Sequence, residues 1–342
     1  MAIIDKPSDY FNTVLYTGNG GTQAITGVGF KPDFNWIKDR DGTPSHVLHD
    51  IIRGVTKRIM SNNTNAEDTG SQINSFDTDG FTVPNNNNNT NGSDFVAWNW
   101  LGSNTTASNG NGSITSTVSL NATAGFSVVK WTGSGANATI GHGLGVTPSM
   151  LMVKNVTAVG GWRVWHQDLG TTESLQLNTT AAVSTSAGQF NSSATFNSTV
   201  FSVGGEGDTN QSSQTIISYS FAEKQGYSKF GSYTGNGNAD GTFVYTGFKP
   251  AMIIIKQINE ARDWLIIDNK RLGYNVKNYD LHPNDNVAED TRERLDIVSN
   301  GFKMRDASNA NNKSGGSYIY MAFAENPFVT STDNGSIPAT AR

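Results

Sequence analysis

The chain has 342 residues, of which 36% are hydrophobic, 10% aromatic and 15% charged, and its formal net charge is −5. No Lys/Arg cluster is long enough to neutralise a run of phosphates, so nucleic-acid binding is not expected. Cysteine is absent, which excludes disulfides, thiolate metal ligands and cysteine nucleophiles. The N-terminus lacks a signal-peptide pattern, and no run of about 18 apolar residues suggests membrane insertion.

The chain begins with a short arm, residues 1–9, in which Ile3 and Ile4 are apolar. We expect this arm to dock onto another protein. Deleting residues 1–12 should then leave a folded chain that no longer joins its assembly.

Three copies of one pattern follow the arm. The motif YTGNG at residues 16–20 recurs as WTGSG at 131–135 and as YTGNG at 233–237. Each copy continues with a Gly-x-x-Pro turn, an apolar run (FNWI, MLMV or MIII) and a lysine. An apolar run bounded by proline and a charge is typical of a strand buried on both faces. A second strand is expected to end in an acid, at Asp50, Asp168 or Asp268.

The later part of each copy predicts a hairpin and a closing strand. Asp79-Gly80 and Asn300-Gly301 favour a two-residue turn, whereas copy two keeps only Phe201. Alternating strands then close the copies: FVAWNW, IISYSF and YIYMAF.

These patterns predict an all-β chain of three tandem antiparallel β-sandwich or jelly-roll domains. The domains should span 10–114, 115–225 and 226–328, followed by an extended tail at 329–342. Each can bury its own core, so we expect separate beads rather than interdependent repeats. The best helix candidate, residues 289–295, is too short to stand alone.

Ten residues are predicted to be structural members of the repeated core. They are Trp36, Lys38, Phe81, Trp100, Lys154, Phe201, Phe221, Lys256, Phe302 and Phe323.

No catalytic residue, metal ligand or cofactor site is predicted. Closely spaced acids such as Asp77 and Asp79 fall in glycine-containing turns, where a carboxylate caps backbone amides. One polar loop of copy three places aromatic rings beside amides and acids, an arrangement suited to sugars. Its candidate glycan contacts, weighed against an ordinary surface loop, are Tyr274, Asn278, Tyr279, Asp280 and His282.

The repeat set resembles a β-rich domain family of virion structural, tail-fibre-like proteins from marine tailed bacteriophages. The resemblance rests on the YTGNG start, the GFKP turn, SNGFK at 299–303 and MAFAENPF at 321–328. Residues 227–250 are its most specific part, and copy two departs most because it has Val-Thr-Pro in place of Phe-Lys-Pro.

This resemblance implies a non-enzymatic virion protein assembled in the host cytoplasm, most often a tail fibre or tail-associated appendage involved in host attachment. Its partners would be other virion proteins, further copies of itself in a trimer, and host surface glycan. A capsid decoration protein is the alternative, and a polysaccharide depolymerase is a third interpretation.

Overall fold

The computed structural model describes all residues except 1–2, 71, 192–194, 272–274, 276–277 and 331–342. The described part is built from strands β1 to β27, and its helices are η1 (Pro7–Asp9), α1 (Ala187–Phe190) and α2 (Gly207–Asn210). The all-β prediction is therefore confirmed. No helix in these ranges is long and apolar enough to cross a membrane.

Unit 1 (β1 to β8) has one larger and one smaller antiparallel sheet. The larger sheet runs in the order β1 (Phe11–Thr17), β8 (Asp94–Trp100), β3 (Phe34–Asp39), β4 (Val47–Asp50) and β5 (Ile59–Met60). The smaller sheet runs β2 (Gln23–Ile25), β7 (Gly80–Val83) and β6 (Ser75–Asp77).

Unit 2 (β9 to β18) repeats this plan with an extension. Its larger sheet runs β14 (Trp162–His166), β13 (Met150–Asn155), β18 (Thr215–Phe221), β11 (Phe126–Thr132), β10 (Ser116–Asn121) and β9 (Ala107–Asn109). Two pairs complete it: β12 (Ala138–Gly141) with β17 (Val200–Val203), and β15 (Glu173–Ser174) with β16 (Ser184–Thr185). Because β9 pairs with β10, unit 2 begins by residue 107, earlier than the predicted boundary at 115.

Unit 3 (β19 to β27) follows the same order. Its larger sheet runs β19 (Ser228–Thr234), β27 (Ser317–Pro327), β21 (Phe248–Gln257), β22 (Trp264–Asp268), β23 (Asn278–Leu281) and β24 (Asp290–Arg292). The smaller sheet runs β20 (Phe243–Tyr245), β26 (Gly301–Met304) and β25 (Leu295–Val298). The best helix candidate, residues 289–295, is not helical, because this segment contains β24 and the start of β25.

The apolar strands β3, β13 and β21 are buried on both faces, as predicted. Side chains alternate between the faces of a strand. In β21, Ile253 and Ile255 pack with the smaller sheet of unit 3, whereas Met252 and Ile254 face the other way. The ten predicted core residues are likewise all buried, each at most 1% exposed.

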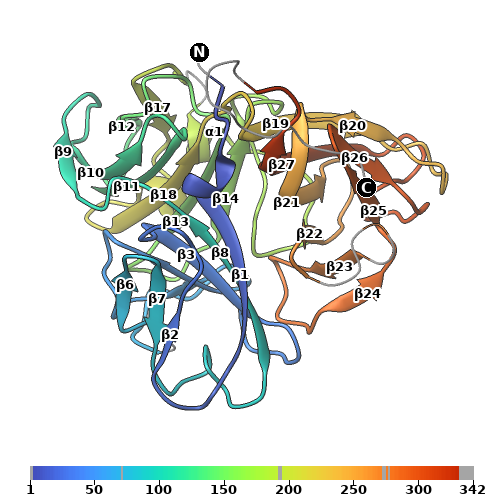
Figure 1. Ribbon diagram of the computed structural model, residues 1–342. Helices are drawn as coiled ribbons and strands as arrows, with labels where there is room; N and C mark the ends of the chain where they lie inside the picture. Colours follow the sequence, from blue (N-terminus) through green and yellow to red (C-terminus); the bar gives the residue numbers. More distant parts are fainter. Residues whose placement is uncertain (1–2, 71, 192–194, 272–274, 276–277, 331–342) are drawn as a thin grey trace.

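Each larger sheet has one face toward its own smaller sheet and one face away from it. The faces that point away from the smaller sheets meet in one core shared by the three units. It contains Trp36 of unit 1, Met152 of unit 2 and Ile254 of unit 3, together with their neighbours. In Figure 1 the units form blue-to-cyan, green-to-yellow and orange-to-red lobes around a common centre. The expectation of separate beads is wrong, because each unit covers apolar surface of the others.

The N-terminal arm is also part of this assembly. Ile4 is buried in the shared core, and its backbone N–H donates to the Gln225 carbonyl (3.0 Å). The Phe11 ring, already inside β1, stacks on Phe323 with 5.0 Å between centroids. The docking proposal for residues 1–12 therefore needs correction, since deleting them would remove core side chains.

Candidate functional site

Three buried lysines mark equivalent positions near the ends of β3, β13 and β21. Lys38, Lys154 and Lys256 are fully buried, and burial lowers the pKa of each to about 8. The Lys154 ammonium donates to the carbonyls of Thr64 in unit 1 (3.2 Å) and Gly160 in unit 2 (2.8 Å). Lys256 likewise donates to the Thr180 carbonyl of unit 2 (3.0 Å) and to the Arg262 carbonyl of its own unit (2.6 Å). Lys38 donates only within unit 1, to the carbonyls of Asp39 and Gly42. All three ammonium groups are thus bonded to backbone carbonyls.

Each unit also extends a loop onto the next, so the contacts close a ring. Unit 1 meets unit 2 where the Glu67 N–H donates to the Val156 carbonyl. Unit 2 meets unit 3 where the Val183 N–H donates to the Ile258 carbonyl, and unit 3 meets unit 1 where the Glu289 N–H donates to the Arg40 carbonyl. Each of the three N···O distances is 2.8 Å. We call these boundaries seam 1–2, seam 2–3 and seam 3–1.

Seam 3–1 departs from the other two at one backbone position. Gly160 and Arg262 each donate their N–H across a seam (2.9 Å in both cases), whereas the equivalent residue in unit 1 is Pro44, which has no N–H. The Asn286 side chain instead donates to the Thr43 carbonyl (2.8 Å). A side-chain contact therefore helps to close the ring.

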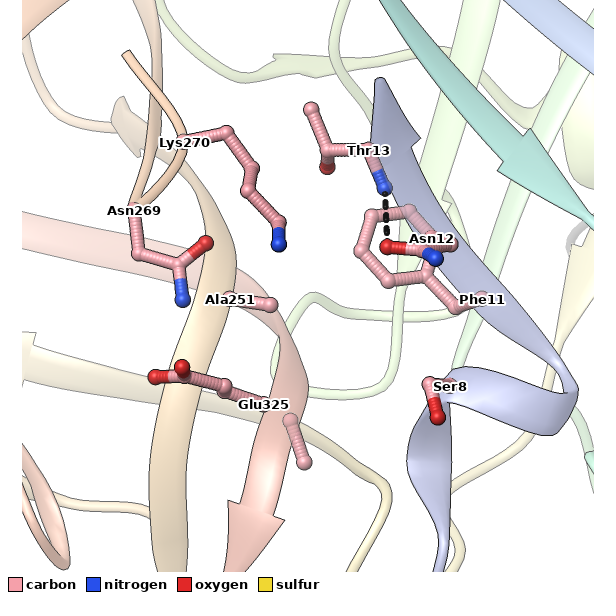
Figure 2. A pocket seen from close by; sticks show the side chains of 9 residues that line it. Ser8, Phe11, Asn12, Thr13, Ala251, Asn269, Lys270 and Glu325 are labelled. Carbon is pink, nitrogen blue, oxygen red and sulfur yellow. Dashed lines mark hydrogen bonds between the residues drawn. The ribbon is translucent and has the colours of Figure 1, made fainter. Parts of the chain in front are cut away.

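A small pocket of about 120 Å³ lies in seam 3–1 (Figure 2). Figure 2 shows the Lys270 side chain extending toward it, opposite Thr13. The Thr13 hydroxyl and the Asn269 side-chain carbonyl have no hydrogen-bond partner among the described residues. The pocket exists because Ala251 stands where unit 1 has Asp33, whose carboxylate is bonded to neighbouring backbone. Its size suits a water or a small polar group.

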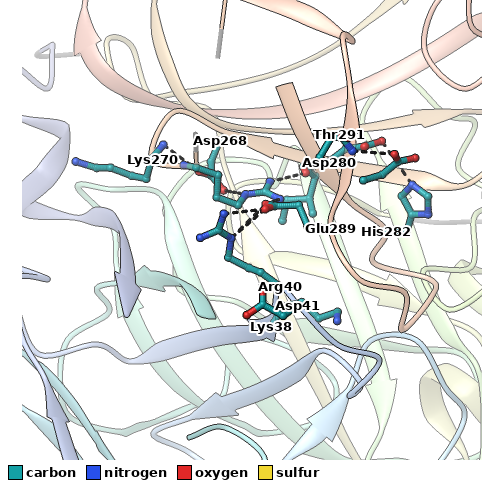
Figure 3. A network of polar contacts seen from close by, with 12 residues as sticks. Lys38, Arg40, Asp41, Asp268, Lys270, Asp280, His282, Glu289 and Thr291 are labelled. Carbon is teal, nitrogen blue, oxygen red and sulfur yellow. Dashed lines mark hydrogen bonds and ion pairs between the residues drawn. The ribbon is translucent and has the colours of Figure 1, made fainter. Parts of the chain in front are cut away.

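Beside this pocket, seam 3–1 contains a buried ion network (Figure 3). Arg271 lies 2.7 Å from the Asp268 carboxylate and 3.0 Å from that of Glu289. Arg40 reaches Glu289 from unit 1 at 2.7 Å, and the Trp98 indole donates to Asp268 (3.1 Å). Each charge therefore meets an opposite charge inside the protein, as a buried structural network requires.

Seam 1–2 keeps the same pair as Asp50 and Arg53, 2.6 Å apart. Seam 2–3 does not, because strand register places His166, rather than the predicted Asp168, opposite the start of β13. The His166 ring donates to the Tyr320 carbonyl (3.2 Å), and burial lowers its pKa to about 4, which leaves it neutral. The three seams thus share geometry but differ in chemistry.

The candidate glycan residues do not form one exposed surface among those described. Tyr274 lies outside the described residues, Asn278 is in β23, and Tyr279 is half-buried. Asp280 is fully buried and pairs with Arg294 at 2.9 Å. Burial lowers the pKa of His282, but the Asp280 carboxylate 3.5 Å away outweighs this and raises the pKa above its usual value. Asp280 and His282 are thus engaged within unit 3.

Two of the closely spaced acids accept hydrogen bonds from backbone N–H groups of turns. Asp79 accepts the backbone N–H groups of Gly27 (3.0 Å) and Gly29 (2.6 Å), which lowers its pKa. Asp39 accepts those of Asp41 and Gly42 in the same way. Within the described ranges, no group of three or more His, Asp or Glu side chains is placed to hold a metal.

A second pocket, of about 360 Å³, lies where unit 2 passes into unit 3. We call it the join pocket. Its lining includes the charged side chains of Glu223 and Lys229, the amide of Gln225, and the apolar surfaces of Tyr245 and Val329. Tyr245 is 57% exposed, a large value for an aromatic residue on a strand. This pocket could not be predicted from the sequence, because its lining residues come from separate segments of the chain.

Three β units closed into a ring around a shared core define an all-β repeat protein. The chain belongs to the family described as "Domain of unknown function (DUF7483)", which matches residues 6–327. That single match includes all three units and residues 6–9 of the N-terminal arm, in agreement with the common core of the units. No curated protein and no solved structure matches the chain.

Proposed function

We propose that this protein is a non-enzymatic structural component of a tailed-phage virion, located in a tail-associated appendage that takes part in host attachment. The resemblance of its repeats to virion structural proteins supports the class. The observation that carries a structural role is the closed ring, in which the geometry repeated in each unit serves packing between units.

The ring also suggests how the protein fits its assembly. Three similar units around one centre offer a partner three similar outer surfaces. Trimeric fibres and local threefold positions of a capsid both supply a partner with matching symmetry. One chain can therefore occupy a site that would otherwise take three small subunits.

Capsid decoration is the second candidate, and the compact ring is compatible with it. Separate beads, as expected from the sequence, would suit an elongated fibre, whereas the three units lie side by side around one core. A compact block suits a lattice position as well as it suits a tail.

Immunogold electron microscopy of intact particles tests the proposal. An antibody to this chain should label the tail or its fibres, and a particle lacking the gene should show no label. Gold spread over the head would replace the appendage with capsid decoration. Purified particles without any label would refute a virion role altogether.

A further inference from the structure

We propose that the join pocket is a saccharide-binding site, with Tyr245 as the aromatic surface on which a sugar ring stacks. This deepens the attachment role proposed above and rests on it for biological meaning. Binding itself can be measured on the purified chain.

The first argument is asymmetry among the three units. Strand register places Tyr245 in line with Thr26 of unit 1 and Gly141 of unit 2. Two of the three units therefore have a small residue at this position, so the fold does not require an aromatic ring there. An exposed aromatic ring on unit 3 alone has no role in packing that the other two units share.

The second argument is access. In unit 2 strand β10 pairs along the edge of β11, whereas in the described part of unit 3 the only sheet strand beside the corresponding β19 is β27. The other edge of β19 is met by a single bridge from Lys224 to Ser228 and by the Gln167 side chain, which donates to the Phe230 carbonyl (2.9 Å). The pocket lies beside the start of β19, where no strand covers it, and includes Ser228 and Lys229. A ligand can therefore approach polar side chains and the aromatic ring together.

The third argument is the chemistry of the lining. Sugars present hydroxyl groups at their edges and apolar C–H groups on their faces, so they need hydrogen-bonding groups beside an aromatic plane. The Lys229 ammonium and Glu223 carboxylate lie 2.7 Å apart and are each about one-third exposed. Such a pair can donate to one ligand hydroxyl and accept from its neighbour.

Two further groups are available. Within the part of the chain that the structure describes, neither the Tyr245 hydroxyl nor the Gln225 amide is bonded to another side chain. The pocket volume of about 360 Å³ is in the range of small-ligand sites. Mixed lining of this kind favours a saccharide over an apolar peptide, which would need a continuous hydrophobic groove.

The test uses the full chain on an array of immobilised hexoses, deoxyhexoses, N-acetylhexosamines, sialic acid and their oligomers, followed by titration of the strongest binder. Tyr245→Ala should weaken binding about tenfold or more, whereas Tyr245→Phe should retain most of it. Phe243→Ala is the matched control, since Phe243 is an exposed aromatic on the same strand that does not line the pocket.

All three variants should keep a thermal unfolding midpoint close to that of the parent chain, because Phe243 is 47% and Tyr245 57% exposed. Absence of saccharide binding by the parent chain, or equal loss in the Tyr245→Ala and Phe243→Ala variants, would overturn the inference. Binding that depends on Tyr245 in a protein that gold does not find on particles would instead refute the virion role and leave the site standing.

Discussion

Unit 3 expressed alone, as residues 226–330, is expected to be unfolded or to self-associate. In the whole protein, one face of its larger sheet is covered by the other units. The large apolar side chains that this excision would uncover are Phe230, Met252, Ile254, Trp264, Ile266, Leu281, Ile319, Met321 and Phe323.

The expected loss follows from that buried surface. Complete burial of one such side chain contributes about 1.5–3 kcal/mol, and their own unit still covers part of each. With roughly half of the burial lost, the set would lose on the order of 10 kcal/mol. That is comparable with the whole stability of a typical domain, about 5–15 kcal/mol.

Size-exclusion chromatography with light scattering and thermal unfolding by circular dichroism measure the outcome. Mixing the fragment with residues 3–225 is the control, since it should restore a one-to-one complex with a cooperative transition. A monomeric fragment that unfolds cooperatively by itself would refute the shared-core argument.

Three further predictions follow from the seams and the arm. Arg271→Met should destabilise the protein by about 3–5 kcal/mol in urea unfolding, because it leaves Asp268 buried without its cation. The control Arg292→Met, at an exposed arginine, should change the stability by less than about 0.5 kcal/mol. Equal effects of the two substitutions would contradict a buried network. Phe11→Ala should cost about 3–5 kcal/mol through the cavity it leaves, measured in the same way, and a near-neutral result would show that the arm is peripheral. Between pH 8 and 10 Lys154 holds more of its proton in the unfolded chain than in the folded one, because burial lowers its pKa from about 10.5 to about 8. This residue should therefore raise the free energy of unfolding by up to about 2 kcal/mol over that range, and Lys154→Met should make the pH dependence shallower by that share, since Lys38 and Lys256 keep theirs; an unchanged slope would be the contrary result.

The all-β character of each unit could be predicted from the sequence because the signals of strands and turns are local. The hairpin before Phe81 is present, but its turn residues are Thr78 and Asp79, and Gly80 opens the next strand. Gly80 is needed for close approach: a Cβ there would lie 2.0 Å from the Ile25 carbonyl oxygen. A dipeptide typical of turns can thus mark a crowded strand instead.

The shared core could not be predicted in the same way. The run MIII shows that both faces of its strand are covered, yet nothing in those letters says that the second cover is another unit. Asp268 and Trp98 are 170 positions apart, so their contact has no local signal. The contacts of the candidate glycan residues had no local signal for a related reason: Asp280 and His282 belong to a segment that the sequence presents as a polar loop, but Asp280 pairs with Arg294, which lies between β24 and β25, and His282 lies 3.5 Å from the same carboxylate.

The differences among the seams have an evolutionary consequence. In a homotrimer, one mutation changes all three interfaces and all three outer surfaces at once. Covalent linkage of the copies removes that constraint, so His166 can replace the acid of Asp50 at one seam while the other two keep their ion pairs. The same freedom lets Tyr245 arise on a single copy, which makes gene fusion a route from a symmetric scaffold to a protein with one specialised face.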